Sequence, residues 1–107
     1  WEYDPATNSW AQRANFGGGV RSGAVAFAIG SKGYVGTGCG TSFATSDFWE
    51  YDPSTNSWNQ KANVSGPRRF GSGFSAEGKG YIGSGNGTVN GQNGLIINYQ
   101  DLWQYCP

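Results

Sequence analysis

Seven carboxylate side chains, seven Lys or Arg side chains and two cysteines are the groups that could do chemistry in this 107-residue chain. Histidine is absent, so neither a Ser–His nor a Cys–His nucleophile–base pair can form within the chain. The same absence removes the favoured ligand of zinc and copper sites. A carboxylate-pair hydrolase would need two acids that converge to about 5–10 Å in one cleft.

The acidic residues recur at the spacing of an internal repeat, which does not indicate a catalytic pair in one cleft. Residues 1–10 read WEYDPATNSW and residues 49–58 read WEYDPSTNSW, so nine of ten positions are identical at a spacing of 48. A third, shorter copy, WQYCP, occupies residues 103–107. Among the acidic residues, only Glu77 has no repeat partner. A residue that recurs at the repeat spacing is interpreted as stabilising the repeat unit. We therefore predict no catalytic residue, no metal site and no cofactor. The recurring acids are Glu2/Glu50, Asp4/Asp52 and Asp47/Asp101.

Most basic residues also recur and are interpreted as structural. In one of these pairs, Arg21 with Arg69, the arginines are expected to hydrogen-bond carbonyl groups or to stack between repeat units. Arg68 is unpaired in this alignment, and beside Arg69 it gives a local positive spot. Two interpretations of Arg68 stay open: contact with a ligand, or a solvated loop. The recurring bases are Arg13/Lys61, Arg21/Arg69 and Lys32/Lys79.

The elements that must position these residues are short strands joined by turns. Residues 47–51 and 57–61 are expected to form a hairpin around an Asp-Pro-Ser-Thr-Asn turn. In this turn proline fixes one φ, while Asp and Asn bond locally and tolerate positive φ. Four strands per unit and no helical periodicity predict an all-β repeat. The remaining predicted strands are 22–29, 33–38, 70–76, 80–85 and 101–105.

Three groups of residues resemble kelch repeats, each of which forms a four-stranded β-propeller blade. Arg-Ser-Gly at 21–23 and Arg-Phe-Gly at 69–71 match the opening of the first blade strand. Two glycine-rich segments, 33–40 and 80–87, match the second strand, with Gly-Thr-Gly and Gly-Ser-Gly where the family has a double glycine. That variant resembles exported bacterial kelch proteins. The third group is the Tyr and Trp seven residues apart across the turn: Tyr3 with Trp10, and Tyr51 with Trp58.

The resemblance covers essentially the whole chain and implies a propeller segment of about two four-stranded blades. Unit one spans 1–48, unit two spans 49–102, and a third unit starts at 103–107. Because propellers typically have four to eight blades, the ring closes only with more blades or by oligomerisation. We expect a fragment of a longer propeller, and the alternative is a protomer of a trimer or tetramer. Galactose-oxidase-like enzymes share this propeller, but their copper needs histidine, so their activity is not carried over.

Function is expected in the loops, because the connections between strands 2 and 3 and between strands 4 and 1 share one face. The loops Thr41–Ser46 and Gly87–Gln100, with Arg68, are predicted to contact a protein or a glycan. The second loop has an apolar run that either binds a partner or forms its own hairpin packed on the neighbouring blade. Its candidate residues are Leu95, Ile96, Ile97 and Tyr99.

The predicted function is therefore a non-enzymatic binding or scaffold module. One alternative is a self-assembling structural propeller unit. Another is a fragment of a secreted carbohydrate-active enzyme whose catalytic residues lie outside these residues. The balanced charge, seven against seven, does not favour nucleic acid, and no apolar run approaches the length of a membrane span. The richness in Asn, Ser, Thr and Gly favours an extracellular, bacterial protein.

The two cysteines are placed by the predicted topology. Cys39 follows the second strand of its unit, and Cys106 follows a third strand, which runs antiparallel to the second. The two thiols are therefore expected at opposite ends of the blades, too far apart for the roughly 7 Å between Cα atoms that a disulfide tolerates. We predict no disulfide between them within one chain.

Overall fold

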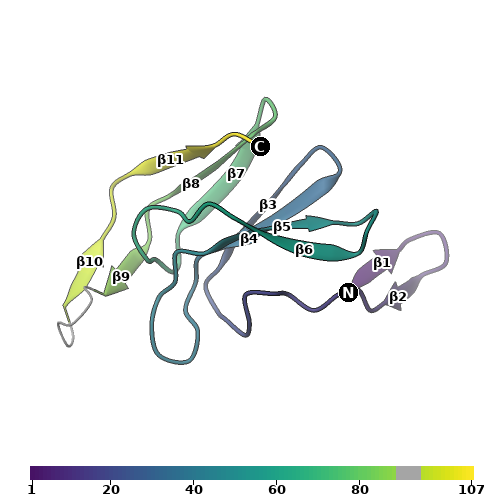
Figure 1. The fold of residues 1–107 in the computed structure, drawn as a ribbon, viewed down its shortest axis with the longest axis horizontal. Coiled ribbons are helices and arrows are strands. Elements are labelled where there is room, and N and C mark those ends of the chain that lie inside the picture. The colour runs from purple at the N-terminus through teal and green to yellow at the C-terminus, as the bar shows by residue number, and fades with distance from the viewer. Residues whose placement is uncertain (89–94) are drawn as a thin grey trace.

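In the computed structural model, which describes residues 1–88 and 95–107, all regular structure is β (Figure 1). The described residues contain no helix, as the absence of helical periodicity predicts. All strand pairs are antiparallel. The strands are β1 (Glu2–Asp4), β2 (Ser9–Ala11), β3 (Val25–Ile29), β4 (Lys32–Gly36), β5 (Phe48–Asp52), β6 (Ser57–Lys61), β7 (Ser72–Ala76), β8 (Lys79–Gly83), β9 (Asn86–Thr88), β10 (Ile96–Asn98) and β11 (Leu102–Tyr105).

The strands form four separate sheets that follow the predicted repeat. The central sheet has the spatial order β3-β4-β5-β6, which is also the order along the chain. The C-terminal sheet, β7-β8-β11, repeats its first three strands. The N-terminal hairpin, β1-β2, corresponds to its last two, and β9-β10 is an extra hairpin inserted between β8 and β11. The central sheet is thus the one complete four-stranded unit within the described residues.

The first strand of each unit starts later than predicted. β3 begins at Val25 and β7 at Ser72, where the sequence patterns predict 22 and 70. The physical reason is a backbone break, because Gly23 and Phe70 adopt φ values of 65° and 57°. Positive φ is incompatible with extended strand geometry, so pairing begins only after these residues.

The predicted Tyr–Trp hairpins are confirmed. Tyr51 lies directly opposite Trp58 across β5 and β6, with ring centroids 5.1 Å apart. The turn between them is fixed by Asp52, whose Oδ1 accepts a hydrogen bond from the Ser54 amide at 2.9 Å. Asn56 ends the turn with φ of 49°. The N-terminal hairpin repeats the cross-strand pair with Tyr3 and Trp10, 5.2 Å apart.

The hydrophobic core lies between sheets and not within one. Val25, Tyr34 and Phe48 of the central sheet pack with Ile82 of the C-terminal sheet, and all four are at most 4% exposed. The two sheets meet along β3 and β7. A Cβ built on Gly73 would lie 2.0 Å from Cγ1 of Val25, so glycine is what lets these strands approach closely.

The two small hairpins project at opposite ends of an elongated molecule, whose principal extents are 49 × 31 × 22 Å (Figure 1). β1 and β2 form one end, and β9 and β10 form the other. Within the described residues, the outer edge of β11 has no partner strand, whereas its counterpart β5 pairs with β6.

Candidate binding surface

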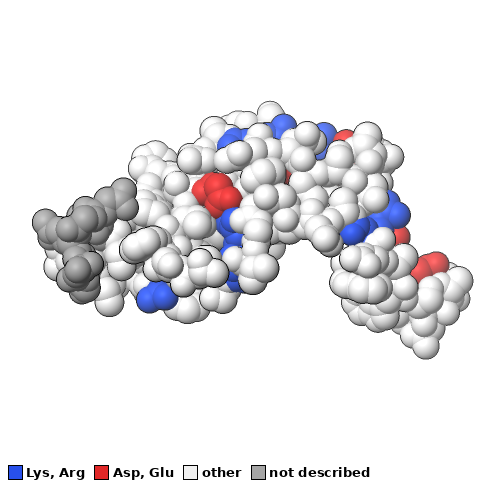
Figure 2. Space-filling model, turned by 60° about the horizontal axis from the view of Figure 1, so that its bottom comes forward, with Lys and Arg blue, Asp and Glu red and all other residues white. Residues whose placement is uncertain are grey.

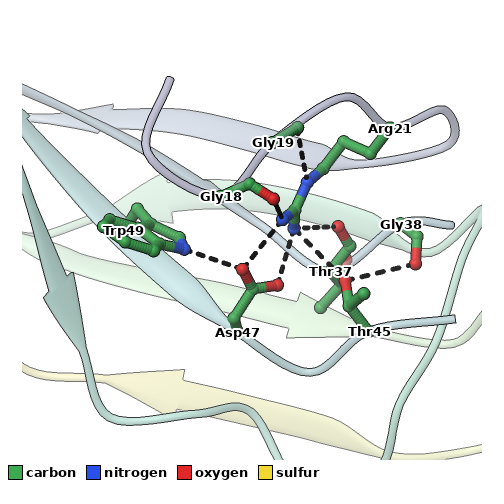
Figure 3. A network of polar contacts seen from close by, with 8 residues as sticks. All are labelled: Gly18, Gly19, Arg21, Thr37, Gly38, Thr45, Asp47 and Trp49. Carbon is green, nitrogen blue, oxygen red and sulfur yellow. Dashed lines mark hydrogen bonds and ion pairs between the residues drawn. The ribbon is translucent and has the colours of Figure 1, made fainter. Parts of the chain in front are cut away.

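Arg21 is held in a polar network at the start of the central sheet (Figure 3). Its Nη1 and Nη2 contact the two carboxylate oxygens of Asp47 at 2.6 and 2.8 Å. Nη1 also donates to the backbone oxygen of Thr37 at 2.9 Å, and the guanidinium lies over the Phe16 ring. Asp47 in turn accepts a hydrogen bond from Trp49 Nε1 at 2.7 Å. Burial alone raises the pKa of Asp47, but hydrogen bonds from Arg21 and Trp49 outweigh it and lower this pKa.

Arg68 makes the same contacts in the C-terminal sheet. Its Nη1 and Nη2 lie 2.6 and 2.9 Å from the two oxygens of Asp101, and Nη1 donates to the Ser84 backbone oxygen at 3.2 Å. The guanidinium stacks over Tyr99, 4.1 Å from the ring centroid. Trp103 Nε1 donates to Asp101 at 2.7 Å, as Trp49 does to Asp47. The side chain of Arg68 is 0% exposed.

These contacts correct two predictions. Arg68, and not Arg69, is the structural counterpart of Arg21, and Arg68 is fully buried, so it neither lies in a solvated loop nor is exposed to contact a ligand. The physical reason is a one-residue difference in the connection before each sheet. It changes the repeat spacing from 48 at the Tyr–Trp hairpins to 47 at the arginines. Because Lys32 and Lys79 are also 47 residues apart, the sequence contained a signal that could have found the shift.

Arg69 takes the place that Ser22 has in the central sheet. Ser22 pairs with Cys39 and Arg69 pairs with Asn86, in equivalent isolated bridges. The Arg69 side chain turns toward the loops, where its Nε donates to Oδ1 of Asn86 at 3.2 Å. Its Nη1 lies 3.8 Å from Sγ of Cys39. Arg69 therefore breaks the repeat, although the sequence alignment assigned it a recurring structural role.

The candidate residues of the second loop divide into two groups. Leu95, Ile96 and Ile97 are 50%, 56% and 40% exposed. Residues 96–98 form β10 and pair with β9, so the hairpin foreseen as one alternative is present. Tyr99 instead packs on Arg68, and its hydroxyl donates to the Pro67 backbone oxygen at 3.2 Å. Part of the predicted Gly87–Gln100 loop, residues 89–94, lies outside the described residues.

The first loop, Thr41–Ser46, lies beside the arginine region. Thr45 pairs with Arg68 in an isolated bridge, and its amide donates to the Gly38 oxygen at 2.8 Å. Phe43 at the loop tip is 71% exposed. The loop and the β9-β10 hairpin together line a small cavity that also contains Arg69, Cys39 and Asn86. Asn86 is a residue that the sequence analysis did not list as a site candidate, although it differs from its repeat partner Cys39.

Glu50 is the most buried carboxylate, at 5% exposure, and its surroundings are structural. It accepts a hydrogen bond from the Tyr34 hydroxyl at 2.8 Å and lies 3.2 and 3.3 Å from the Lys32 and Lys61 ammonium groups. Burial alone raises its pKa, while these hydrogen bonds lower it and dominate. The burial of Tyr34, with its bond to Glu50, raises the pKa of that hydroxyl. Glu50 thus pairs with two lysines within the sheet, and one of them, Lys32, also pairs with Asp52.

The cysteines lie where the topology predicts. Cys39 follows β4 on the side of the loops, whereas Cys106 follows β11, whose last residue, Tyr105, pairs with Gly80 at the far end of β8. Both thiols are free. Among residues 1–88 and 95–107, no group of three His, Cys, Asp or Glu side chains could hold a metal ion. None of the described segments is a helix long and apolar enough to span a bilayer.

Charged residues are scattered over one face of the molecule. The face drawn in Figure 2 is mostly uncoloured, with blue and red in small separate areas and no broad field of one sign. Together with the exposed apolar residues of β10, this favours recognition through local contacts over long-range attraction of a highly charged partner.

The fold and this surface define an all-β protein built from several antiparallel sheets, an arrangement compatible with a propeller-like segment. No protein-family model matches the chain, and no curated protein matches it. Among solved structures, the chain is similar to YjhT, with a TM-score of 0.67 and 28% sequence identity over 74% of this chain. The chain spans about a quarter of the length of YjhT, since the match covers 25% of that chain.

Proposed function

We propose that the chain is a segment of a kelch-type β-propeller and acts as a non-enzymatic binding module for a protein or a glycan. The contact surface comprises the loop Thr41–Ser46 and the described part of the β9-β10 hairpin. The kelch assignment is supported by the recurring Tyr–Trp hairpin and the repeated Arg–Asp network. We also propose an extracellular location, on the grounds of composition.

The observation that carries this function is the exposed apolar run of the β9-β10 hairpin. Leu95 and Ile96 are each at least half exposed, and they lie in the one connection that is much longer than its repeat counterpart. A hairpin that is unnecessary for the blade and presents adjacent aliphatic side chains is typical of a recognition site. Phe43 of the neighbouring loop, 71% exposed, adds an aromatic group to the same surface.

The test uses the triple variant Leu95→Ser/Ile96→Thr/Ile97→Ser, which keeps residues that tolerate strand geometry. Wild-type chain is first screened against an array of defined glycans and a display library of peptides. Each hit is then titrated as a purified compound. The triple variant is expected to bind the hit at least tenfold more weakly, with an unchanged far-UV circular dichroism spectrum.

The matched control is Phe74→Thr, which removes an exposed aromatic side chain from β7, away from both loops. This variant is expected to bind as the wild type does. A triple variant that binds with wild-type affinity would refute the proposal, as would a wild-type chain that binds no member of either collection. Loss of folded structure in the triple variant would indicate that the apolar run packs on a neighbouring blade.

A second candidate function is a self-assembling propeller unit, because within the described residues the outer edge of β11 is available to a further strand. The counterpart strand β5 pairs along five residues with β6, so β11 offers the backbone groups for a further strand. Native mass spectrometry of the chain separates the two functions. A discrete trimer or tetramer favours self-assembly, and a monomer favours the binding module.

A further inference from the structure

Arg69 differs from Arg21 and Arg68, the two arginines that precede the first strands of their sheets. Arg21 and Arg68 each form a bidentate ion pair with an aspartate. Among the described residues Arg69 has no acidic partner. Its recorded contacts are Oδ1 of Asn86, the sulfur of Cys39 and the ring of Phe70, whose centroid is 5.3 Å away. A guanidinium carries five N–H donors, and these contacts leave the Nη2 group without an acceptor in the described part of the chain.

The side chain of Arg69 lines a cavity of about 90 Å³ between the two loops. Its walls combine neutral polar groups with apolar ones, and no carboxylate contributes to them. A cavity of this size holds more than a single water molecule, and it suits a group of a few heavy atoms. The lining includes Cys39, Phe43, Arg69, Asn86, Thr88 and Ile96.

We propose that this cavity binds a single carboxylate group, held by the guanidinium of Arg69. The planar fork of an arginine matches the two oxygens of a carboxylate, the geometry that Arg21 and Arg68 already adopt with their aspartates. One positive charge in neutral surroundings balances a monoanion, whereas the second charge of a phosphate would stay uncompensated in a partly enclosed site. This inference deepens the proposed binding function and rests on it, since it names the chemistry that the loop face recognises.

A carboxylate could come from an acidic sugar or from an acidic peptide, and two probes distinguish these sources. Sodium glucuronate represents the sugar, with glucose as its neutral control. N-acetyl-glutamate methylamide represents the peptide, with the corresponding glutamine derivative as control. Each probe is titrated into ¹⁵N-labelled chain while the backbone amide shifts of Arg69, Asn86 and Thr88 are followed.

A carboxylate probe is expected to shift these three amides saturably, and its neutral control is not. Arg69→Gln should weaken binding at least tenfold, and Arg69→Lys should weaken it less, because it keeps the charge but loses the planar fork. The charge-matched control is Lys79→Gln, which removes one exposed positive charge from β8 and is expected to bind like wild type. Equal shifts with acid and neutral probes, or wild-type affinity in Arg69→Gln, would overturn the proposal.

The failure of this inference is distinguishable from failure of the proposed function. If neither carboxylate binds while a glycan or peptide hit still depends on Leu95–Ile97, the carboxylate site is refuted and the binding module stands. If the acid probes bind through Arg69 but no larger ligand does, the carboxylate site stands and the broader surface is refuted. A dispersed amide spectrum of each variant confirms that the chain is folded.

Discussion

The guanidinium of Arg68 is 0% exposed and meets the carboxylate of Asp101 through two contacts of 2.6 and 2.9 Å. Arg21 and Asp47 form the same pair in the preceding sheet at 2.6 and 2.8 Å. In both cases the arginine precedes the first strand and the aspartate precedes the third. The ion pair therefore ties the entry of each sheet to its third strand, which no local turn could do.

The first prediction separates the two adjacent arginines. Arg68→Ala should destabilise the chain by about 3 kcal/mol, because it leaves Asp101 and three backbone oxygens without their buried partner. Arg69→Ala should cost less than about 1 kcal/mol, because its contacts are partly exposed and include no ion pair. Urea unfolding of both variants measures the difference. A larger loss of unfolding free energy in Arg69→Ala than in Arg68→Ala would instead support Arg69 as the counterpart of Arg21.

The second prediction concerns acid stability. Hydrogen bonding from Arg68, followed by that from Trp103, lowers the pKa of Asp101 from its ordinary 3.8 to about 2. The stabilisation by this carboxylate is then fully present above pH 3.8 and is lost as the pH falls through about 2.

Urea unfolding between pH 7 and pH 2 tests this dependence. Asp101→Asn should remove the part of the acid dependence that this group causes. Trp103→Phe deletes one hydrogen bond and keeps the ion pair. The acid dependence of its unfolding free energy should therefore lie between those of Asp101→Asn and wild type. An identical pH dependence in Asp101→Asn and wild type would contradict the assignment.

The third prediction is a stabilising substitution. Thr37 is fully buried with φ of 58°, a conformation that is strained for a β-branched residue. Its hydroxyl has no hydrogen-bond partner among the described residues. Thr37→Gly relieves both costs while keeping the backbone bond to Arg21, so we expect a gain of about 1 kcal/mol. Ser84→Gly, at the exposed counterpart with φ of 57°, should gain less, and thermal unfolding compares the two.

The fourth prediction tests the contact between sheets. Gly73→Ala places a methyl group against Val25, which is 4% exposed, and should cost about 1–3 kcal/mol through overpacking. Shortening the opposing side chain in Gly73→Ala/Val25→Ala should cost less than the sum of the two single changes. A double-mutant cycle on unfolding free energies measures this coupling, and strictly additive effects would show that β3 and β7 do not meet as described.

Much of the fold could be predicted because its signals are local. The Asp-Pro-x-Thr-Asn turn specifies its own hairpin through an aspartate side chain and a positive-φ asparagine, and the Tyr–Trp pair follows from the turn. Strand order and antiparallel pairing followed from the resemblance to four-stranded propeller blades. The exact starting residues of β3 and β7 could not be predicted. The positive φ of Phe70 breaks the strand, and side-chain alternation does not encode this backbone conformation.

The candidate site was predicted less well, since burial depends on distant residues. Leu95–Ile97 are the non-repeating apolar run, and the structure places them on an exposed hairpin, while their role in binding stays a prediction. Tyr99 belongs to the Arg68 network instead. Phe43 belongs to the predicted loop Thr41–Ser46, whereas Asn86 was not predicted and joins the site through the proximity of two loops from different units.

By itself the sequence determined the repeat, the all-β class and the groups that are absent from the chain. Those properties depend on residue identity and on short spacings. Only the tertiary structure decided which arginine is buried. Arg68 and Arg69 are neighbours with the same side chain, and a one-residue shift in the preceding connection aims the first at Asp101 and the second at the loops. Burial and ion pairing are set by what converges in space, and Asp101 lies 33 residues further along the chain.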